Sequence, residues 1–317
     1  MHKIFELIEK SKKIAIFAHI NCDGDAVGSV MSFYNYLKSI DKDVFVFLQR
    51  PINDNYYYMG INEVANIKFD SSYDLAISVD CPNTKRFGEF EKEFFKATES
   101  IQIDHHIDNE QFATVNCVDS KASSTCEIIY KLFTENEIKI DDSIATCLYS
   151  GIITDTRRFI NPNVTSNSLF VAGKLIDCGA NFDVLNYNLF GRIKKNEFEI
   201  LKLALNCTEF YEDGKIAFVG ITKKMLDKAN ADSTCTYRII DQVNSIDGVE
   251  ICALLTENKY RDNMVSVRTK QKSAQRICKA FGGGGHLRAS GCRIFVPFNI
   301  AKEQLIEECK KEFFRND

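Results

Sequence analysis

The sequence predicts an α/β protein in which a parallel sheet with helices on its faces is followed by a smaller second α/β domain. Three observations predict this class. Four short β-branched or aromatic runs alternate with helical or irregular stretches up to residue 106. Helical periodicity then dominates residues 123–206. A second α/β-like set of runs begins at residue 215 and continues to the end.

Each predicted element has its own signal. The first four predicted strands are KIAIFAH (13–19), DVFVFLQ (43–49), LAISVD (75–80) and SIQIDHH (100–106). The apolar spacing of AVGSVMSFYNYLKSI (26–40) predicts a helix between the first and second strands. Helices are also predicted within EIIYKLF (127–133), SIATCLYSGIITDT (143–156), SNSLFVAGKLIDCG (166–179) and NEFEILKLALN (196–206). The later strands are KIAFVGIT (215–222), VEICALLTEN (249–258) and MVSVRTK (264–270).

The length of 317 residues favours two domains over one hydrophobic core. We predict a first domain over 1–190, a helical linker over 191–207 and a second domain over 208–317.

Composition narrows the class of protein. The chain is 45% hydrophobic and 26% charged, as ordinary globular proteins are. A net charge of −4 argues against a protein that coats long nucleic acid, although a metal could supply positive charge for a small phosphorylated substrate. The 12 cysteines form no C-x-x-C pair, and no run approaches the ~18 apolar residues of a membrane span. We therefore expect a cytoplasmic protein without a membrane partner.

Acidic and imidazole side chains follow three of the predicted strands. HINCDGDAVGS (19–29) contains Asp23, LAISVD ends in Asp80, and SIQIDHH ends in the triplet 104–106. Because the carboxyl ends of parallel strands meet at one edge of a sheet, we expect these side chains to lie close together.

Carboxylates gathered in one cleft need protons or cations. At ~4 Å each like-charge pair costs on the order of 4 kcal/mol at an effective dielectric near 20. The nearby imidazoles favour a metal, and mixed oxygen and nitrogen ligands favour Mn²⁺ over Mg²⁺. Asp23 and Asp25 could each face one of two metals, with Asp80 between them. Taken alone, NCDGD is an ordinary Asx turn or helix N-cap, and Thr154-Asp155-Thr156 a polar helix end.

Four segments together resemble the motifs of the DHH phosphoesterase superfamily: HINCDGDAVGS, SVDCPN, IDHHIDN and GIITDTRRF. The later FGGGGHLRASG resembles the signature of the DHHA1 domain. The resemblance implies a parallel-sheet DHH domain and a smaller DHHA1 domain, with the active site in the cleft between them.

The resemblance also implies roles for individual residues. One Mn²⁺ is expected on His19, Asp23 and Asp80, and a second on Asp25, Asp80, His105 and Asp155, with Mg²⁺ or Co²⁺ as possible substitutes. Asp104 is expected to orient a histidine or the loop, and His106 to face the scissile phosphate, so that His106, Asp80 and Asp104 form the catalytic set. Two metals at bridging distance would turn one water into the attacking hydroxide.

The glycine run 282–285 suggests a phosphate-binding loop, with a flexible hinge as the alternative. We expect these glycines to serve close backbone approach to an anion and not packing. Arg157 stands where glycine is frequent in relatives and could contact another phosphate. The expected substrate contacts are Arg268, Gly283, Gly284, Gly285, His286, Ser290 and Arg157.

Three side motifs have simpler interpretations. Ser124-Thr125-Cys126-Glu127 is predicted to be a helix capping box, and Tyr56-Tyr57-Tyr58 to pack or lie on a lobe surface. Phe159, just past Arg157 and Arg158, is a better candidate for base stacking than the tyrosines, although packing is the favoured interpretation for it too.

The resemblance implies hydrolysis of short oligoribonucleotides to mononucleotides and removal of the 3′-phosphate of pAp, adenosine 3′,5′-bisphosphate. The alternatives are a phosphodiesterase for cyclic di-AMP or pApA, a family II inorganic pyrophosphatase, and a nucleotide sensor without turnover. A homodimer is possible.

Overall fold

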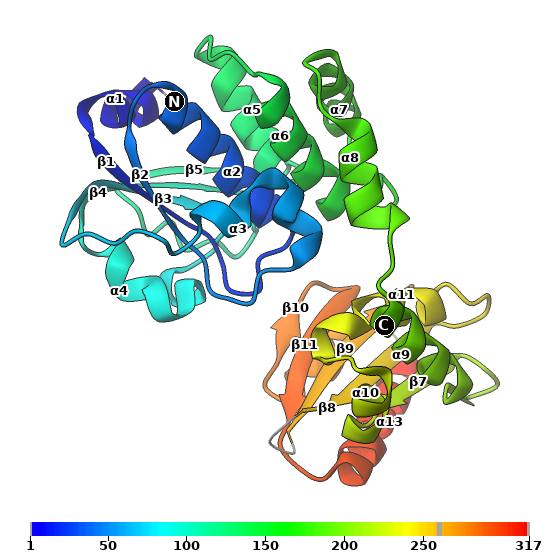
Figure 1. Cartoon of the computed structure of the whole chain (residues 1–317). Helices are drawn as coiled ribbons and strands as arrows, with labels where there is room; N and C mark the ends of the chain where they lie inside the picture. The colour runs from blue at the N-terminus through cyan, green and yellow to red at the C-terminus, as the bar shows by residue number, and fades with distance from the viewer. Residues whose placement is uncertain (1, 259–261, 316–317) are drawn as a thin grey trace. The chain divides into compact units, whose positions relative to one another are not determined.

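The computed structural model describes residues 2–258 and 262–315, which fall into two compact units (Figure 1). Unit 1 extends to Arg192 and unit 2 begins at Ile193. Helix α9 (Lys195–Asn206), within the predicted linker range, packs in unit 2, where its apolar residues Ile200 and Ala204 are fully buried. Among the described helices, none combines the length and the apolar composition needed to cross a bilayer.

The sheet of unit 1 is parallel throughout, as predicted. Its strands are β1 (Lys13–Phe17), β2 (Asp43–Phe47), β3 (Tyr73–Val79), β4 (Ala97–Asp104) and β5 (Val115–Val118), in the order β2-β1-β3-β4-β5. The chain order reverses between β1 and β3, and ligands of open α/β sheets bind outside the strand ends at such a reversal. The first four strands match the predicted runs.

The two faces of this sheet carry different cores, because successive strand residues point to opposite sides. Ile14 and Ile16 of β1 pack in an aliphatic core with α1 (His2–Lys10), α2 (Gly24–Ser39), α5 (Thr125–Glu135) and α6 (Asp142–Asp155). Phe17 and Phe47 pack in an aromatic cluster with the 3₁₀ helix η2 (Thr84–Phe90) and α4 (Glu91–Phe94). Figure 1 shows these helices on opposite sides of the sheet.

The remaining helices of unit 1 are short or peripheral. They are the 3₁₀ helix η1 (Asp54–Met59), α3 (Ile61–Val64), α7 (Ser166–Asp177), α8 (Phe182–Asn186) and the π-helix η3 (Tyr187–Gly191). Tyr58 of η1 packs against the aliphatic core and its hydroxyl hydrogen-bonds that of Ser150 at 2.6 Å. Tyr56 also packs against this core and Tyr57 is exposed, so these tyrosines pack or lie on the surface, as predicted.

Helices α2 and α6 approach each other closely because glycines line their contact. A Cβ on Gly24 would lie 2.3 Å from Thr154 Oγ1, and one on Gly28 would lie 2.5 Å from the carbonyl oxygen of Cys147. No side chain larger than hydrogen fits at either position. This contact brings the first turn of α2 beside the last turn of α6.

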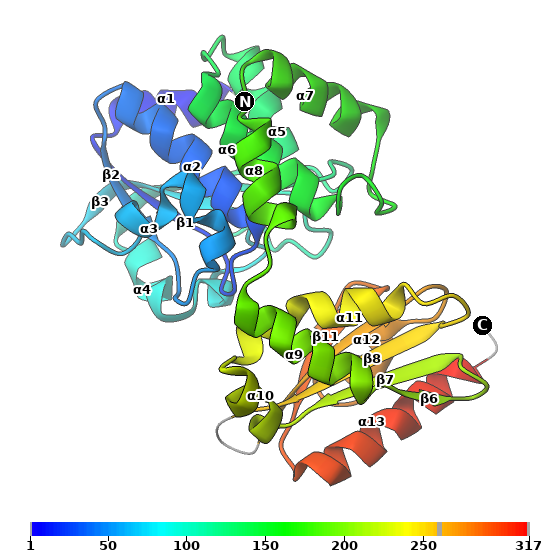
Figure 2. The same ribbon diagram turned by 45° about the vertical axis from the view of Figure 1, so that its right-hand side comes forward.

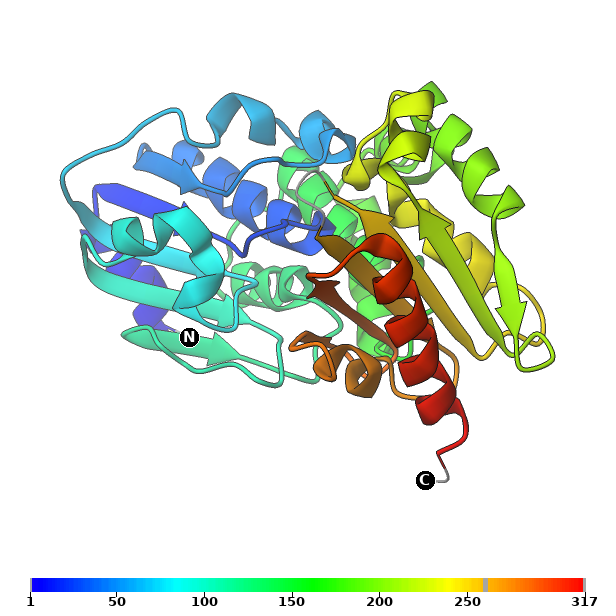
Figure 3. The same ribbon diagram turned by 90° about the horizontal axis from the view of Figure 1, so that it is seen from below.

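Unit 2 contains a mixed sheet in the order β10-β11-β9-β8-β7-β6 (Figures 2 and 3). The strands are β6 (Glu209–Tyr211), β7 (Ile216–Ile221), β8 (Ile251–Glu257), β9 (Asn263–Thr269), β10 (Gly284–Gly285) and β11 (Ala289–Ile294), and only β7 and β8 pair in parallel. One face is covered by α9, α10 (Lys223–Ala229) and α11 (Tyr237–Asn244), which follows the 3₁₀ helix η4 (Ser233–Thr236). The other is covered by α12 (Ala274–Lys279) and α13 (Phe298–Phe313).

Candidate metal centre

The predicted ligands come from three strand ends and two helix ends of unit 1. His19 follows β1, Asp80 follows β3, and His105 and His106 follow β4. Asp23 is the N-cap of α2, Asp25 lies in that helix's first turn, and Asp155 is the last residue of α6. The fold gathers all of them at the predicted edge of the sheet.

His19, Asp23 and Asp80 form the first group of potential ligands. His19 Nε2 lies 3.8 Å from Asp23 Oδ1 and 3.4 Å from Asp80 Oδ2. One ligand atom from each residue lies within 4.8 Å of the others, a spacing that one metal ion could span. Asp23 also accepts hydrogen bonds from the Asp25 and Ala26 backbone amides, so it caps α2 as well.

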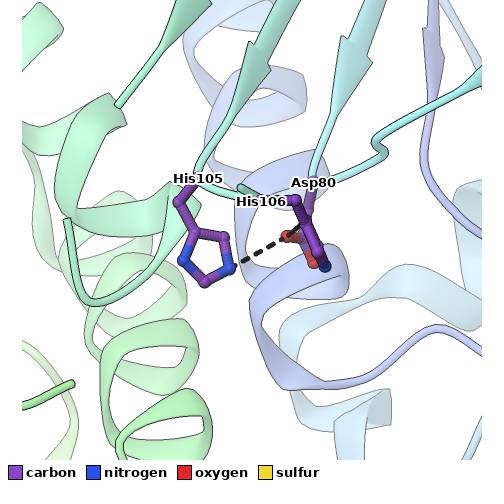
Figure 4. Close-up of side chains that lie close together, drawn as sticks. All are labelled: Asp80, His105 and His106. Atoms are coloured by element: carbon purple, nitrogen blue, oxygen red, sulfur yellow. Dashed lines mark ion pairs between the residues drawn. The ribbon is translucent and has the colours of Figure 1, made fainter. Parts of the chain in front are cut away.

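Asp25, His105 and Asp155 form the second group. His105 Nε2 lies 4.0 Å from Asp25 Oδ2, 3.6 Å from Asp155 Oδ2 and 3.7 Å from Asp80 Oδ1. Asp80 thus directs one oxygen to each group. Figure 4 shows its carboxylate facing both His105 and His106, and His106 Nδ1 lies 3.7 Å from Asp80 Oδ1.

Asp104 is fully buried and binds three donors without entering either group. His106 Nδ1–H donates to its Oδ1 at 2.8 Å, the His105 backbone N–H donates to the same oxygen at 2.9 Å, and the Asn109 amide donates to Oδ2. Burial raises the pKa of Asp104, but the bonds from His106 and Asn109 bring it below its usual value. This arrangement holds His106 in one orientation.

The N-terminus of α5 holds two of the clustered carboxylates. The backbone N–H groups of Thr125 and Cys126 donate to Asp25 Oδ2 at 2.7 Å and Oδ1 at 3.0 Å, and the Thr125 hydroxyl donates to Asp80 Oδ1 at 3.1 Å. The predicted capping box is present only in part. Ser124 caps the helix, but the Glu127 carboxylate accepts from the backbone and hydroxyl of Ser123, not from the Ser124 amide.

The sequence analysis missed this contribution of α5. Its signal lies in the helix N-terminus itself, where unpaired N–H groups attract anions, and not in any particular residue type.

The electrostatics of the centre require positive charge. Burial, then repulsion from Asp80, raises the pKa of Asp25 to about 7. Burial, then repulsion from Asp25, raises the pKa of Asp155 well above its usual value. Without a cation these carboxyl groups retain protons at pH values where exposed carboxyls are ionised. Buried carboxylates with two imidazoles form a donor set that fits divalent transition metals.

Asp80 adopts a left-handed backbone conformation, with φ of +51°. Aspartate, asparagine and glycine are the residues that most readily adopt this conformation. Its backbone N–H donates to Ile103 O at 3.0 Å, which ties the end of β3 to β4. The position therefore requires both a particular backbone conformation and a carboxylate.

The chain beyond α6 surrounds Asp155 with amide donors. Arg157, Arg158 and Phe159 have φ values of +47°, +61° and +60°. The side-chain amides of Asn161 and Asn163 then donate to the Asp155 carbonyl at 3.0 and 3.4 Å. Arg157 is exposed beside the centre, whereas Phe159 packs against the unit 1 core, which weakens its candidacy for base stacking.

Comparison with known proteins agrees with this geometry. The family model for the DHH family N-terminal domain matches residues 13–152, a range that contains every predicted ligand except Asp155. Unit 1 of this chain therefore contains a DHH-family N-terminal domain. The chain is 29% identical to the probable bifunctional oligoribonuclease and PAP phosphatase NrnA of Streptococcus mutans, over 97% of each chain. It is 26% identical to the bifunctional oligoribonuclease and PAP phosphatase NrnA of Bacillus subtilis, over 89% of each.

Two solved structures share the fold of this DHH protein. An exopolyphosphatase-related protein of Bacteroides fragilis superposes with a TM-score of 0.91 at 24% identity, covering 98% of this chain and 95% of that one. The exonuclease RecJ of Thermus thermophilus, in complex with Mn²⁺, has a TM-score of 0.61 at 13% identity, covering 99% of this chain and 54% of RecJ. Both solved structures therefore share the fold of this chain over almost its whole length.

Half of the glycine run of unit 2 lies in the sheet: Gly284 and Gly285 form the two-residue strand β10, and Gly282 and Gly283 precede it. Gly284 and Gly285 pair with Gly291 and Ser290 of β11. The expectation that these glycines play no part in packing is wrong for Gly283, because a Cβ there would lie 2.3 Å from Cys292 Cβ. Around Gly284, in contrast, a Cβ would meet nothing within 4 Å, so its backbone is open to a ligand.

The other predicted substrate contacts of this DHH protein already have protein partners. The buried Ser290 hydroxyl donates to the His286 carbonyl at 2.8 Å and closes the turn before β11. Arg268 of β9 lies 3.6 Å, Nε to Oδ1, from Asp241 of α11. A substrate phosphate would compete with Asp241 for Arg268.

Proposed function

We propose that this DHH-family enzyme is a divalent-metal-dependent phosphoesterase that hydrolyses short oligoribonucleotides to mononucleotides and removes the 3′-phosphate of pAp. The observation that carries the proposal is the placement of Asp80, whose two oxygens face two separate ligand groups. The relatives that match over nearly their whole length and are named oligoribonuclease and PAP phosphatase support the substrate class.

The residues divide into two metal sites. His19, Asp23 and Asp80 would hold one cation, and Asp25, Asp80, His105 and Asp155 the other. Mn²⁺ suits this oxygen and nitrogen ligand set, with Mg²⁺ or Co²⁺ as substitutes. When bound, two such cations polarise the attacking water and the phosphoryl oxygens.

His106 supplies the protein's own contact with the scissile phosphate in this proposal. The hydrogen bond to Asp104 requires a proton on His106 Nδ1. Nε2 is then the ring nitrogen left to face the substrate. Burial lowers the pKa of His106, but Asp104 and Asp80 raise it above its ordinary value. A protonated Nε2 can therefore donate to a phosphoryl oxygen as negative charge develops there.

Contacts with the rest of the nucleotide are assigned to unit 2 and to Arg157. The open backbone at Gly284, with His286 in the adjoining turn and Ser290 and Arg268 on the neighbouring strands, is suited to binding a phosphate away from the scissile bond.

The test is product release with Mn²⁺ from pAp, a di- to pentanucleotide RNA series, cyclic di-AMP, pApA and pyrophosphate. Asp80→Asn removes the shared charge while tolerating the left-handed backbone, and should abolish turnover. Asp41→Asn is the matched control, because Asp41 is an exposed aspartate with φ of +56° at the other end of α2. Cleavage of cyclic di-AMP, pApA or pyrophosphate alone would refute the substrate assignment, and undiminished activity of Asp80→Asn would refute the metal assignment.

Gly284→Ala tests the contribution of unit 2. The added methyl group meets no protein atom within 4 Å, so the fold should be unaffected, while KM for pAp should rise several-fold with kcat little changed. Gly173→Ala in α7, where a Cβ also meets nothing within 4 Å, is the control. An unchanged KM would show that the substrate phosphate does not bind at Gly284.

A further inference from the structure

Thr125, the first residue of α5, contacts Asp25 of the second ligand group and Asp80, which faces both groups. It is fully buried. Its backbone N–H donates to Asp25 Oδ2 at 2.7 Å and its hydroxyl donates to Asp80 Oδ1 at 3.1 Å. A single residue thus fixes the relative positions of a ligand carboxylate from α2 and the shared carboxylate from β3.

The Thr125 hydroxyl contacts one oxygen of the Asp80 carboxylate, Oδ1. Asp80 Oδ1 is the oxygen that lies 3.7 Å from His105 Nε2, whereas Oδ2 lies 3.4 Å from His19 Nε2. A carboxylate shared by two cations must present one lone pair to each, so its rotation about the Cβ–Cγ bond matters. A donor bound to Oδ1 restricts that rotation, and with it the direction of both oxygens, without occupying Oδ2.

We propose that Thr125 is a positioning residue for the second cation. Its hydroxyl orients Asp80 Oδ1 toward the second group, and its backbone N–H orients Asp25 toward the same group. This inference rests on the proposed two-metal function. The second site should depend on α5 more than the first does. The described contacts of Thr125 reach Asp25 and Asp80 but neither His19 nor Asp23.

Thr125→Val is the decisive variant, because valine keeps the branched shape and the backbone N–H but lacks the hydroxyl. Mn²⁺ binding to the metal-free full-length chain is measured by calorimetric titration and by electron paramagnetic resonance, which detects coupling between paired ions. The affinity of the second ion should fall 10- to 100-fold, with loss of the coupled signal, as typically follows loss of an outer-shell partner. The affinity of the first ion should fall less, because Asp25 is not among its ligands. The metal-free chain should still fold, with a melting temperature lowered only by the loss of one buried hydrogen bond.

Thr125→Ser should restore the second ion, since serine keeps the hydroxyl. Thr134→Val is the matched control, because Thr134 is an exposed threonine near the other end of α5. Should Thr125→Val not fold, Thr125→Ala removes the hydroxyl without placing a methyl group against Asp80. Weakened binding of the second ion would then support the proposal.

Two results separate this inference from the proposed function. If the unaltered chain binds two ions and Thr125→Val, or Thr125→Ala, binds both equally well, the positioning role is wrong and the two-metal centre stands. If the unaltered chain binds no ion pair, the proposed function itself fails, and with it this inference.

Discussion

Asp104 is a buried carboxylate that acts through another residue. Its bonds to His106 and Asn109 leave it outside both ligand groups. Replacement by asparagine puts an amide in place of the carboxylate and weakens the hydrogen bond that it accepts from His106 Nδ1–H. Loss of such an outer partner typically costs 10- to 100-fold in activity or metal affinity.

We therefore expect Asp104→Asn to lower kcat for pAp about 10- to 100-fold while Mn²⁺ still binds at both sites. Steady-state kinetics and metal titration on the same preparation separate the two effects. The exposed Asp108, four residues on, supplies the control variant Asp108→Asn. Loss of metal binding in Asp104→Asn would show that Asp104 supports the ligands themselves and not His106.

Glu312 is a buried carboxylate of unit 2 that contacts Arg276 and Ser273. Its carboxylate, 4% exposed, accepts bonds from Arg276 Nη2 at 2.8 Å, Arg276 Nε at 2.9 Å and the Ser273 N–H at 2.8 Å. Burial raises its pKa, but the bonds from Arg276 and Ser273 leave the net pKa below the ordinary value. A depressed folded-state pKa contributes stability above the unfolded pKa, and that stability is lost as the pH falls through the folded value.

Glu312→Gln should accordingly destabilise unit 2 at pH 7 by about 1 to 2 kcal/mol, because hydrogen bonds to a charged group are lost beside a partly exposed arginine. The difference from the unaltered chain should shrink below about pH 4.3, where unfolded glutamate protonates, and disappear below the folded pKa. Hydrogen exchange of the α12 and α13 segments across this pH range measures it. A difference independent of pH would contradict the assigned charge.

At the scale of elements, the close approach of α2 and α6 determines the spacing of the centre. A Cβ on Gly151 of α6 would lie 2.2 Å from Cys126 Sγ and 2.7 Å from Asp25 Oδ1. Gly151→Ala should destabilise unit 1 by about 1 to 3 kcal/mol through overpacking. It should also weaken Mn²⁺ binding, because Asp25 must move.

Denaturant unfolding and metal titration check this prediction against Gly173→Ala. The control lies in α7 with open space around it, and alanine there should be neutral or stabilising by up to about 1 kcal/mol. Equal behaviour of the two variants would mean that the helix contact relaxes without affecting the ligands.

The sequence predicted the elements that carry strong local signals. β1 to β4 appear as β-branched and aromatic runs, whereas β5 is a four-residue strand of half-buried residues with little to distinguish it. The convergence of strand ends predicted that Asp23, Asp80 and the triplet 104–106 lie together, whereas the assignment of the two ligand sets came from the resemblance to the DHH superfamily. The α5 contacts were missed because backbone N–H groups have no residue signature, although Gly24 and Gly28, one helical turn apart, could have indicated a close helix contact.

At the scale of the whole molecule, the candidate ligands all belong to unit 1. Cations should therefore stabilise unit 1 selectively, since binding relieves repulsion among carboxylates that burial keeps close together. Mn²⁺ at 100 times its dissociation constant should add about 2.7 kcal/mol.

Hydrogen exchange with and without Mn²⁺ tests this selectivity. Protection should rise in β3, β4, α5 and α6, should return to its starting level with a chelator, and should be unaltered in the α12 and α13 segments. Uniform protection across both units would instead indicate that they respond to metal together.

The left-handed turn at Asp80 has a genetic consequence. Asparagine and glycine tolerate this backbone conformation as aspartate does, and a single base change converts an aspartate codon into a codon for either. Such a mutation removes the shared carboxylate but leaves a turn that still forms. A folded variant without the shared carboxylate is thus a single base change from this sequence. Genetic drift can produce it without an intermediate that fails to fold.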